Sequence, residues 1–229
     1  MLKGKENNWQ NVQVSKEEAA TIESSTRGQV SSGKWYEERK RRITASNFGD
    51  IMTRQKAVNE SFLKNTFCTK TINAKSTSYG QANENNAKRL YINKTKRHLH
   101  AVGLVINPMF PFLGATPDAI VCDDGETGIM EVKCPYSARD MTIPEAVRDI
   151  KDFFLTADGR QCKLKQSHKH YYQVQGQLLV TGAPFCDFVV FTKHDMYIER
   201  VFPDKPVMQL MLEKLLDFYI QHFSHFVKC

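Results

Sequence analysis

The spacing of apolar residues changes several times along the chain, and each change predicts a different kind of element. Apolar residues recur at the spacing of an amphipathic helix over residues 35–52, in two pieces, and over 79–98, and a weaker pattern makes 60–75 helical. Extended apolar runs then predict strands at 101–106, 112–122 and 129–134. We expect the turn between the last two over residues 123–128, where Asp, Gly and Thr gather.

The second half of the chain alternates between the two periods. Helices are expected at 144–154, at 170–181, where Gly182 follows, and at 206–227, with strands at 185–191 and 196–201 between them. Residues 156–168 are polar and basic and are interpreted as a loop. This order of elements is typical of a mixed α/β domain. We expect one domain over residues 31–229, preceded by a polar, flexible lead-in over residues 1–30.

Composition excludes several classes of protein. Apolar residues make up 41% and charged residues 25% of the 229 residues, which is ordinary for a globular chain and excludes disorder and collagen-like repeats. We find no membrane-spanning run, no signal peptide and no zinc-ligand spacing among the six cysteines, so we expect an intracellular protein with reduced thiols. The choice between nucleus and cytoplasm stays open, with the nucleus favoured if the source is eukaryotic. Lys and Arg exceed Asp and Glu by 32 to 25, which suggests a polyanionic partner.

The most informative pattern is a pair of carboxylates on the strands that flank the 123–128 turn. Side chains alternate faces along a strand, so Glu131 and Lys133 point one way, and the hairpin brings Asp118 beside Glu131. Crowded carboxylates favour a bound divalent cation, and Mg²⁺ prefers such oxygen ligands, with the Val132 carbonyl as a further one. A solvated surface hairpin with one Glu–Lys pair is the alternative. Because charged residues interrupt an otherwise apolar strand, the site interpretation gains weight.

Further short blocks accompany this hairpin in a fixed order. They are Trp35 with Arg39, then 43–46; Tyr79, Gly80 and Glu84; 114–118; 130–135; and 172–175. Together they resemble the PD-(D/E)xK nuclease superfamily, in its lambda-type alkaline exonuclease or YqaJ-like viral recombinase branch. The resemblance implies a restriction-endonuclease-like core, with a central mixed β-sheet of about five strands flanked by helices.

The resemblance also implies roles for individual residues. Asp118, Glu131 and Glu84 would bind the metal with help from the Val132 carbonyl, and Lys133 would position the attacking water. A second group would surround the 5′-terminal or scissile phosphate: Arg39, Ser46, Thr116 and Gln173, with Gln175 and Tyr172 as further DNA contacts. Alternatives stay open for several of them. They are a solvated charge for Arg39 and Glu84, a helix cap for Ser46, a cap or a solvent-facing side chain for Gln173, and packing for one of Gln175 and Tyr172.

The implied activity is a Mg²⁺-dependent exonuclease, with Mn²⁺ as a substitute, that digests linear double-stranded DNA from a 5′-phosphorylated end in the 5′-to-3′ direction during recombination or repair. Implied partners are double-stranded DNA, a single-strand annealing protein and further copies of the chain in a homo-oligomer. The basic stretches at 88–97 and 160–170 either follow the DNA backbone or are solvated faces. Two other functions stay open: an endonuclease of the same superfamily, and a non-catalytic DNA-end binding module, which the presence of Asp118, Glu131 and Lys133 disfavours.

Overall fold

The computed structural model describes residues 12–68, 75–159 and 161–226. The strands are β1 (Ile43–Thr44), β2 (His98–His100), β3 (Leu113–Gly114), β4 (Ala119–Asp123), β5 (Glu126–Lys133), β6 (Leu155–Asp158), β7 (Gln161–Leu164), β8 (Cys186–Phe191) and β9 (Met196–Val201). The helices are α1 (Lys16–Ser25), α2 (Gly33–Lys40), α3 (Ala45–Met52), α4 (Glu60–Phe67), α5 (Lys75–Thr95), α6 (Ile143–Asp149), α7 (Lys169–Thr181), α8 (Lys205–Phe218) and α9 (Ser224–Phe226).

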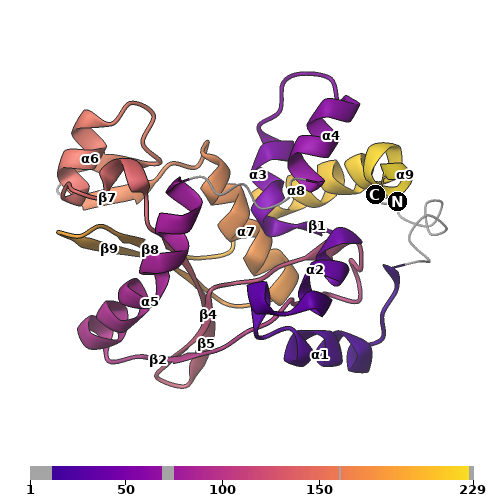
Figure 1. Cartoon of the computed structure of the whole chain (residues 1–229), viewed down its shortest axis with the longest axis horizontal. Helices are drawn as coiled ribbons and strands as arrows, with labels where there is room; N and C mark the ends of the chain where they lie inside the picture. The colour runs from indigo at the N-terminus through magenta and orange to yellow at the C-terminus, as the bar shows by residue number, and fades with distance from the viewer. Residues whose placement is uncertain (1–11, 69–74, 160, 227–229) are drawn as a thin grey trace.

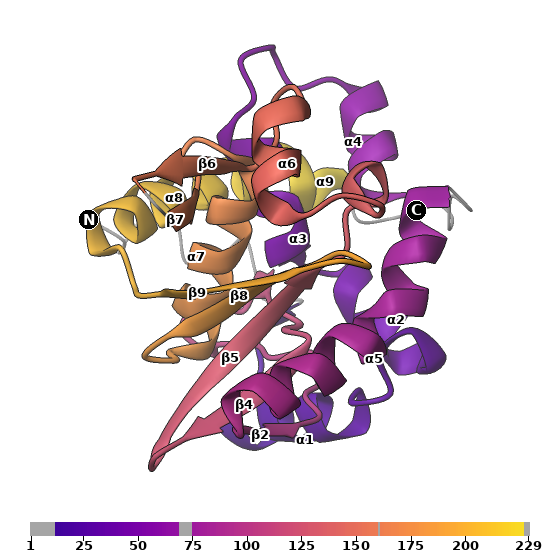
Figure 2. The same cartoon turned by 90° about the vertical axis from the view of Figure 1, so that its left-hand side faces the viewer.

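A five-stranded mixed sheet in the order β2-β4-β5-β8-β9 forms the centre of the domain (Figures 1 and 2). Only β5 and β8 run parallel to each other, and the other neighbours are antiparallel. Two short pairs, β1 with β3 and β6 with β7, lie outside this sheet. The mixed α/β class and the strand count predicted from the sequence are confirmed.

Helices cover both faces of the sheet because β5 is apolar on both sides. Met130 and Val132 pack with Ala87 and Tyr91 of α5 on one face. Ile129 lies in the cluster on the opposite face, which includes residues of α6 and α7. Such a strand alternates between two buried layers, so a charged residue on it is held inside the domain.

Helices α3 and α7 cross at a very short distance. A β-carbon on Gly49 of α3 would come within 2.4 Å of the Lys169 β-carbon, and one on Gly176 of α7 would come within 2.2 Å of the Phe48 ring. No side chain fits at either position. Met211 of α8 packs in the same core cluster as Phe48, so the three helices form one block beside the sheet (Figure 1).

The expected lead-in differs from the structure over its described part. Residues 16–25 form α1, which starts with a capping box between Ser15 and Glu18. Ala19 and Ile22 of this helix are buried against Leu104 and Ile106. Val12 is also buried in the core, so the segment is packed onto the domain from residue 12, while residues 1–11 lie outside the described ranges.

The same contact explains why the strand predicted at 101–106 is wrong. The segment is largely buried, as the pattern indicated, but its backbone binds to α1: the Gly103 amide donates to Glu23 and the Leu104 amide to Thr26. The fifth strand is the preceding β2, whose Leu99 lies between two histidines. The apolar residues correctly indicated that this segment is buried. Its hydrogen-bond partners, however, depend on the neighbouring helix α1 rather than on a strand.

Other departures are local. The loop predicted at 156–168 contains the β6–β7 hairpin, and α6 ends at Asp149 rather than near residue 154. Helix α7 ends as predicted, at Gly182 with φ of 70°, and residues 35–52 form two helices separated by β1. No helix within the described ranges is long and apolar enough to cross a membrane.

Candidate active site

The hairpin of β4 and β5 brings the predicted carboxylates together. Its strands are joined by Asp124 and Gly125, whose φ values of 46° and 88° suit a tight two-residue turn. Ala119 pairs with Met130, and the Asp118 amide donates to the Met130 carbonyl. Asp118 therefore lies beside Glu131, as the spacing predicted. The Asp118 Oδ2 atom also accepts a hydrogen bond of 2.6 Å from the Val132 amide.

Glu131 is the most tightly held side chain of the site. It is 4% exposed, although it is a carboxylate. Its Oε1 atom accepts hydrogen bonds from the Lys133 ammonium at 2.5 Å and the Gln173 amide at 2.6 Å, and its Oε2 atom accepts from Gln177 at 2.6 Å. Two of these donors come from α7, so the helix fixes the carboxylate from the face opposite α5.

Lys133 bridges the strand and the helix. Its Nζ atom donates to Glu131 and, at 2.9 Å, to the Gln173 Oε1 atom. Burial opposes its charge, but the neighbouring Glu131 carboxylate outweighs that effect and raises the pKa of the ammonium, so Lys133 is protonated at neutral pH. The site thus contains one fixed positive charge next to two carboxyl groups.

Glu84 reaches the same site from α5, together with Lys88, which belongs to the basic stretch that the sequence left open as a DNA contact or a solvated face. The Lys88 ammonium donates at 2.6 Å both to Glu84 and to the backbone carbonyl of Asp118. Burial, followed by the charges of Glu131 and Glu84, raises the pKa of Asp118 well above its usual range. This crowding of carboxyl groups would be relieved by a bound cation.

The donor set fits a magnesium ion that retains several water ligands. Within residues 12–68, 75–159 and 161–226, no three His, Cys, Asp or Glu side chains lie close enough together to hold an ion by themselves. Asp118 and Glu131 with the Val132 carbonyl form a smaller, all-oxygen set, and Mg²⁺ is commonly bound by one or two carboxylates plus waters. Glu84 lies beside this set and is paired with Lys88.

Three of the four predicted phosphate-binding residues, Arg39, Ser46 and Thr116, form a second group around Trp35, whereas Gln173 lies beside Glu131 and Lys133. Arg39 lies over the Trp35 ring, with its guanidinium carbon 4.3 Å from the ring centroid, and donates to the Ser46 hydroxyl at 3.2 Å. The Trp35 indole donates to the Thr116 hydroxyl at 3.1 Å. Burial lowers the pKa of Arg39 to about 10, which leaves the guanidinium charged at neutral pH. A cavity of about 560 Å³ is lined by Trp35, Arg39, Thr44 and Asn47, among others.

Thr116 connects the two groups along the chain, because it precedes Asp118 by two residues. Ser46 is exposed at the start of α3 and bonds Arg39, and α3 has no side-chain cap. Its helix-cap alternative therefore finds no support, and its position beside Arg39 keeps it in the phosphate-binding prediction.

Two of the predicted DNA contacts are placed elsewhere. Gln175 is completely buried, and its amide bonds the Phe202 carbonyl and the Asp204 amide at the start of α8. Tyr172 packs against the α3–α8 core cluster. Packing, the alternative that the sequence left open for one of the two, accounts for both positions.

Two residues of the site, Lys88 and Gln177, were not recognised in the sequence. Each is four residues from a recognised residue on the same helix, Lys88 from Glu84 and Gln177 from Gln173. Residues four apart share one face of a helix, so this spacing was the signal that could have identified them.

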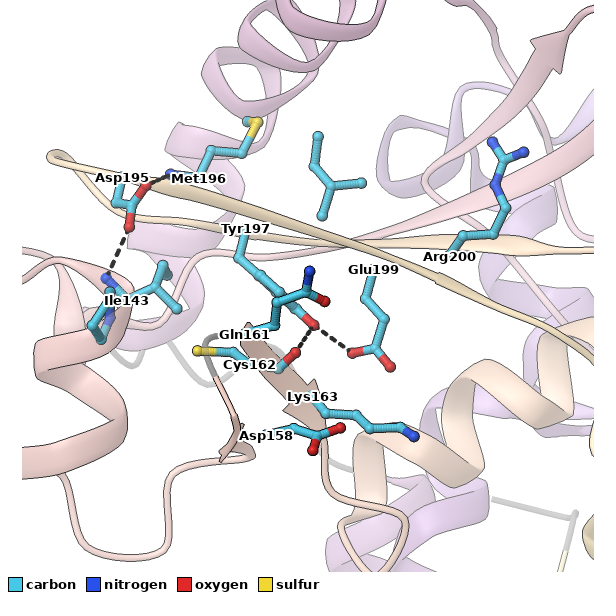
Figure 3. Close-up of a pocket in the computed structure, with 12 residues that line it drawn as sticks. Ile143, Asp158, Gln161, Cys162, Lys163, Asp195, Met196, Tyr197, Glu199 and Arg200 are labelled. Atoms are coloured by element: carbon cyan, nitrogen blue, oxygen red, sulfur yellow. Dashed lines mark hydrogen bonds between the residues drawn. The ribbon is translucent and has the colours of Figure 1, made fainter.

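A separate pocket lies between β9, which is an edge strand of the sheet, and the β6–β7 hairpin (Figure 3). Its volume is about 610 Å³, and none of the predicted site residues lines it. Tyr197 of β9 donates to the Cys162 carbonyl and to Glu199, and Glu199 accepts from the Leu164 amide. These bonds attach the hairpin to β9, which explains its ordered strands.

The five-stranded sheet, with a carboxylate hairpin at its centre, is the fold of the PD-(D/E)xK superfamily, and it matches alkaline exonuclease structures. The model of the YqaJ-like viral recombinase domain matches residues 34–184, and the chain belongs to this family. The alkaline nuclease of Orgyia pseudotsugata multicapsid polyhedrosis virus is 28% identical over an alignment of 213 residues, and the match covers 80% of this chain and 46% of that protein. The chain thus spans about half the length of this curated relative.

Solved structures share the fold at lower sequence identity. The alkaline exonuclease LHK-Exo from Laribacter hongkongensis is 23% identical with a TM-score of 0.63, covering 85% of this chain and 94% of that one, and its complex with dAMP gives 0.65. The SOX protein of KSHV, in a complex with DNA, is 13% identical with a TM-score of 0.59, covering 93% of this chain and 73% of that one. At these identities the likeness shows the fold alone.

Proposed function

We propose that this protein is a Mg²⁺-dependent exonuclease that hydrolyses linear double-stranded DNA from a 5′-phosphorylated end in the 5′-to-3′ direction. The observation that carries the proposal is the meeting of Asp118, Glu131 and Lys133 at one place on the sheet, where Glu131 is buried and the other two are partly buried. Membership of the recombinase family supports the nuclease class, and the matched structures with dAMP and with DNA support a nucleic-acid substrate.

The residues that meet there divide the chemistry between them. A bound divalent ion supplies Lewis-acid polarisation of a phosphoryl oxygen and lowers the pKa of a coordinated water. Asp118, Glu131 and the Val132 carbonyl would hold that ion, with Glu84 beside them. Lys133 supplies a fixed ammonium that can orient the attacking water or stabilise the charge that develops on the phosphate oxygens. Gln173 holds this ammonium in place.

The second group supports the choice of a DNA end. A guanidinium can bind phosphate oxygens through two parallel hydrogen bonds, and among the described residues Arg39 donates one hydrogen bond, to Ser46. The hydroxyl groups of Ser46 and Thr116 add donors of the kind that bind phosphate. A terminal phosphate bound here would place the first phosphodiester toward Asp118, because Thr116 and Asp118 are two residues apart in the chain.

Partners and assembly follow from the same proposal. We propose double-stranded DNA as the substrate, a single-strand annealing protein as the user of the 3′ overhang, and a homo-oligomer as the working form. Mn²⁺ would substitute for Mg²⁺, because it is also bound by carboxylate and water ligands. We also propose a role in recombination or repair.

The test is a digestion assay with Mg²⁺ or Mn²⁺ on four substrates of equal sequence. The substrates are 5′-phosphorylated linear duplex, 5′-hydroxyl linear duplex, single strands and covalently closed circles. We expect the first to be digested fastest, with products released from its 5′ ends, and no digestion after chelation by EDTA.

Two results would contradict the proposal in different ways. Cleavage of closed circles as fast as linear duplex would indicate an endonuclease of the same superfamily. Tight binding to duplex ends without any cleavage in either metal would indicate a non-catalytic end-binding module.

A further inference from the structure

Gln177 on α7 has an environment that helix packing alone does not explain. Its side chain is 1% exposed, and its amide nitrogen donates to the Glu131 Oε2 atom at 2.6 Å. Gln173, one turn earlier, donates to the other oxygen of the same carboxylate. The two amides therefore bind Glu131 from one face of the helix.

Counting the bonds at Glu131 distinguishes its two oxygens. Each carboxylate oxygen offers about two acceptor positions. Oε1 already accepts from Lys133 and Gln173, so both of its positions are used. Oε2 accepts from Gln177 alone among the described residues. The oxygen that retains an acceptor position for a cation is thus Oε2, the one that Gln177 holds.

A second observation points to a role beyond packing. The Gln177 Oε1 atom is buried and has no hydrogen-bond partner among the described residues. Burying an unpaired amide oxygen is unfavourable, and an apolar side chain of similar size would avoid it. The amide is therefore explained by what its nitrogen does for Glu131.

We propose that Gln177 is a positioning residue, which orients Glu131 so that Oε2 is the oxygen through which this carboxylate binds a divalent ion. The inference rests on the proposed metal-dependent function. Gln177 itself does not bind the ion or the DNA, and it acts through Glu131.

The chain offers a matched control on the same helix. Gln175 is also completely buried and also uses its amide, but its partners are Phe202 and Asp204 rather than Glu131. Gln177→Met and Gln175→Met remove the same groups from the same helix. Both should lower the thermal midpoint, whereas only the first should affect the ion.

The measurements are calorimetric titration of Mn²⁺ into each folded variant without DNA, and steady-state cleavage of 5′-phosphorylated duplex. For Gln177→Met we expect the Mn²⁺ dissociation constant to rise about tenfold, as for other residues that orient metal ligands. Its kcat should fall at subsaturating Mn²⁺, with KM for DNA unchanged. Gln175→Met should bind Mn²⁺ like the unmodified protein.

Equal Mn²⁺ affinity in Gln177→Met and the unmodified protein would overturn the inference while leaving the proposed function intact. Equal losses in both variants would also overturn it, because helix packing would then suffice. If the unmodified protein bound no Mn²⁺, the proposed function itself would fail.

A measurement on the unmodified protein covers the case in which Gln177→Met does not fold. In ¹⁵N-resolved NMR, the Gln177 side-chain amide signals should shift on Mg²⁺ addition, and those of Gln175 should not. Unmoved Gln177 signals in a protein that binds Mg²⁺ would contradict the positioning role.

Discussion

The Glu131 centre, formed by Asp118, Glu131 and Lys133, and the Arg39 group, formed by Trp35, Arg39, Ser46 and Thr116, are built in opposite ways. In the Glu131 centre the carboxylate is 4% exposed and both of its oxygens accept hydrogen bonds. In the Arg39 group, Ser46 is exposed, and Arg39 donates one hydrogen bond among the described residues and lies on an aromatic ring. Among the described residues, the hydrogen-bonding positions of the Glu131 centre are nearly all used, whereas the Arg39 group retains unused hydrogen-bond donors.

This difference corresponds to two tasks. Chemistry on a phosphodiester benefits from groups that are held in place before the substrate arrives, because reorganisation during the reaction raises the barrier. Recognition of an end needs donors that a ligand can take up. We therefore expect substitutions in the Glu131 centre to reduce kcat, and substitutions in the Arg39 group to change substrate preference.

The largest effect on catalysis is expected for Lys133→Ala in the Glu131 centre. Loss of the ammonium removes the positive charge beside the carboxylates, and we expect kcat to fall by at least about 10²–10³-fold, the range seen when one charge-stabilising donor is lost. The dissociation constant for duplex DNA should change little. Fluorescence anisotropy and single-turnover cleavage measure the two quantities, with Lys151→Ala, at an exposed lysine, as the control. A normal digestion rate would show that the hairpin is not the active site.

A smaller effect is expected in the Arg39 group. Arg39→Met removes a cation that can pair with a terminal phosphate, an interaction worth about 1.5–3 kcal/mol, so KM for 5′-phosphorylated duplex should rise about 10- to 100-fold. KM for 5′-hydroxyl duplex and kcat should stay nearly constant. Arg41→Met is the matched control, since Arg41 is exposed at the end of the same helix. A preference for phosphorylated ends that survives Arg39→Met would place the phosphate elsewhere.

The smallest expected effect concerns the edge of the Glu131 centre. Lys88 pairs with Glu84 and Lys64 pairs with Glu60, each at 2.6 Å and four residues apart on a helix. The first pair is 22% and 33% exposed and also bonds Asp118, whereas the second is 57% and 75% exposed. We expect Lys88→Met to weaken Mn²⁺ binding about tenfold, at the low end for a metal-orienting residue.

Lys64→Met should leave the Mn²⁺ affinity of the protein unchanged, because exposed pairs of this spacing contribute little. Titration of Mn²⁺ followed by electron paramagnetic resonance compares the two variants directly. An equal response of both would reduce Lys88 to an ordinary surface cation and would leave Glu84 without a link to the site.

Periodicity predicted the sheet and most of its helices because their buried faces recur regularly, as in β5 and α7. Periodicity failed where a segment's burial does not indicate how its backbone is hydrogen-bonded. Residues 101–106 are mostly apolar and buried, yet the Gly103 and Leu104 amides bond Glu23 and Thr26 at the end of α1, and only Val105 forms an isolated bridge, with Ala115. By contrast, β2 is a strand although it has only Leu99 between two histidines. In the β6–β7 hairpin, Leu155 and Leu164 are buried at the ends and most of the intervening residues are polar.

The site shows a similar limit. Strand alternation and hairpin geometry were sufficient to bring Asp118, Glu131 and Lys133 together. They could not show that Gln175 faces α8 while Gln173 and Gln177 face Glu131, because that depends on the rotation of α7 about its axis. Lys88 reached the site for the same reason, since the orientation of α5 on the sheet decides which of its cations turns inward.

The crossing of α3 and α7 has a consequence for how the protein would position a DNA strand. Gly49 and Gly176 let the two helices touch almost backbone to backbone, and these helices carry Ser46 at one end of the candidate site and Gln173 and Gln177 at the other. The crossing thus fixes the distance between the groups that would hold a DNA terminus and the groups that would cut the DNA. A methyl group at either glycine would therefore change this distance first, and would leave the atoms able to touch DNA unaltered.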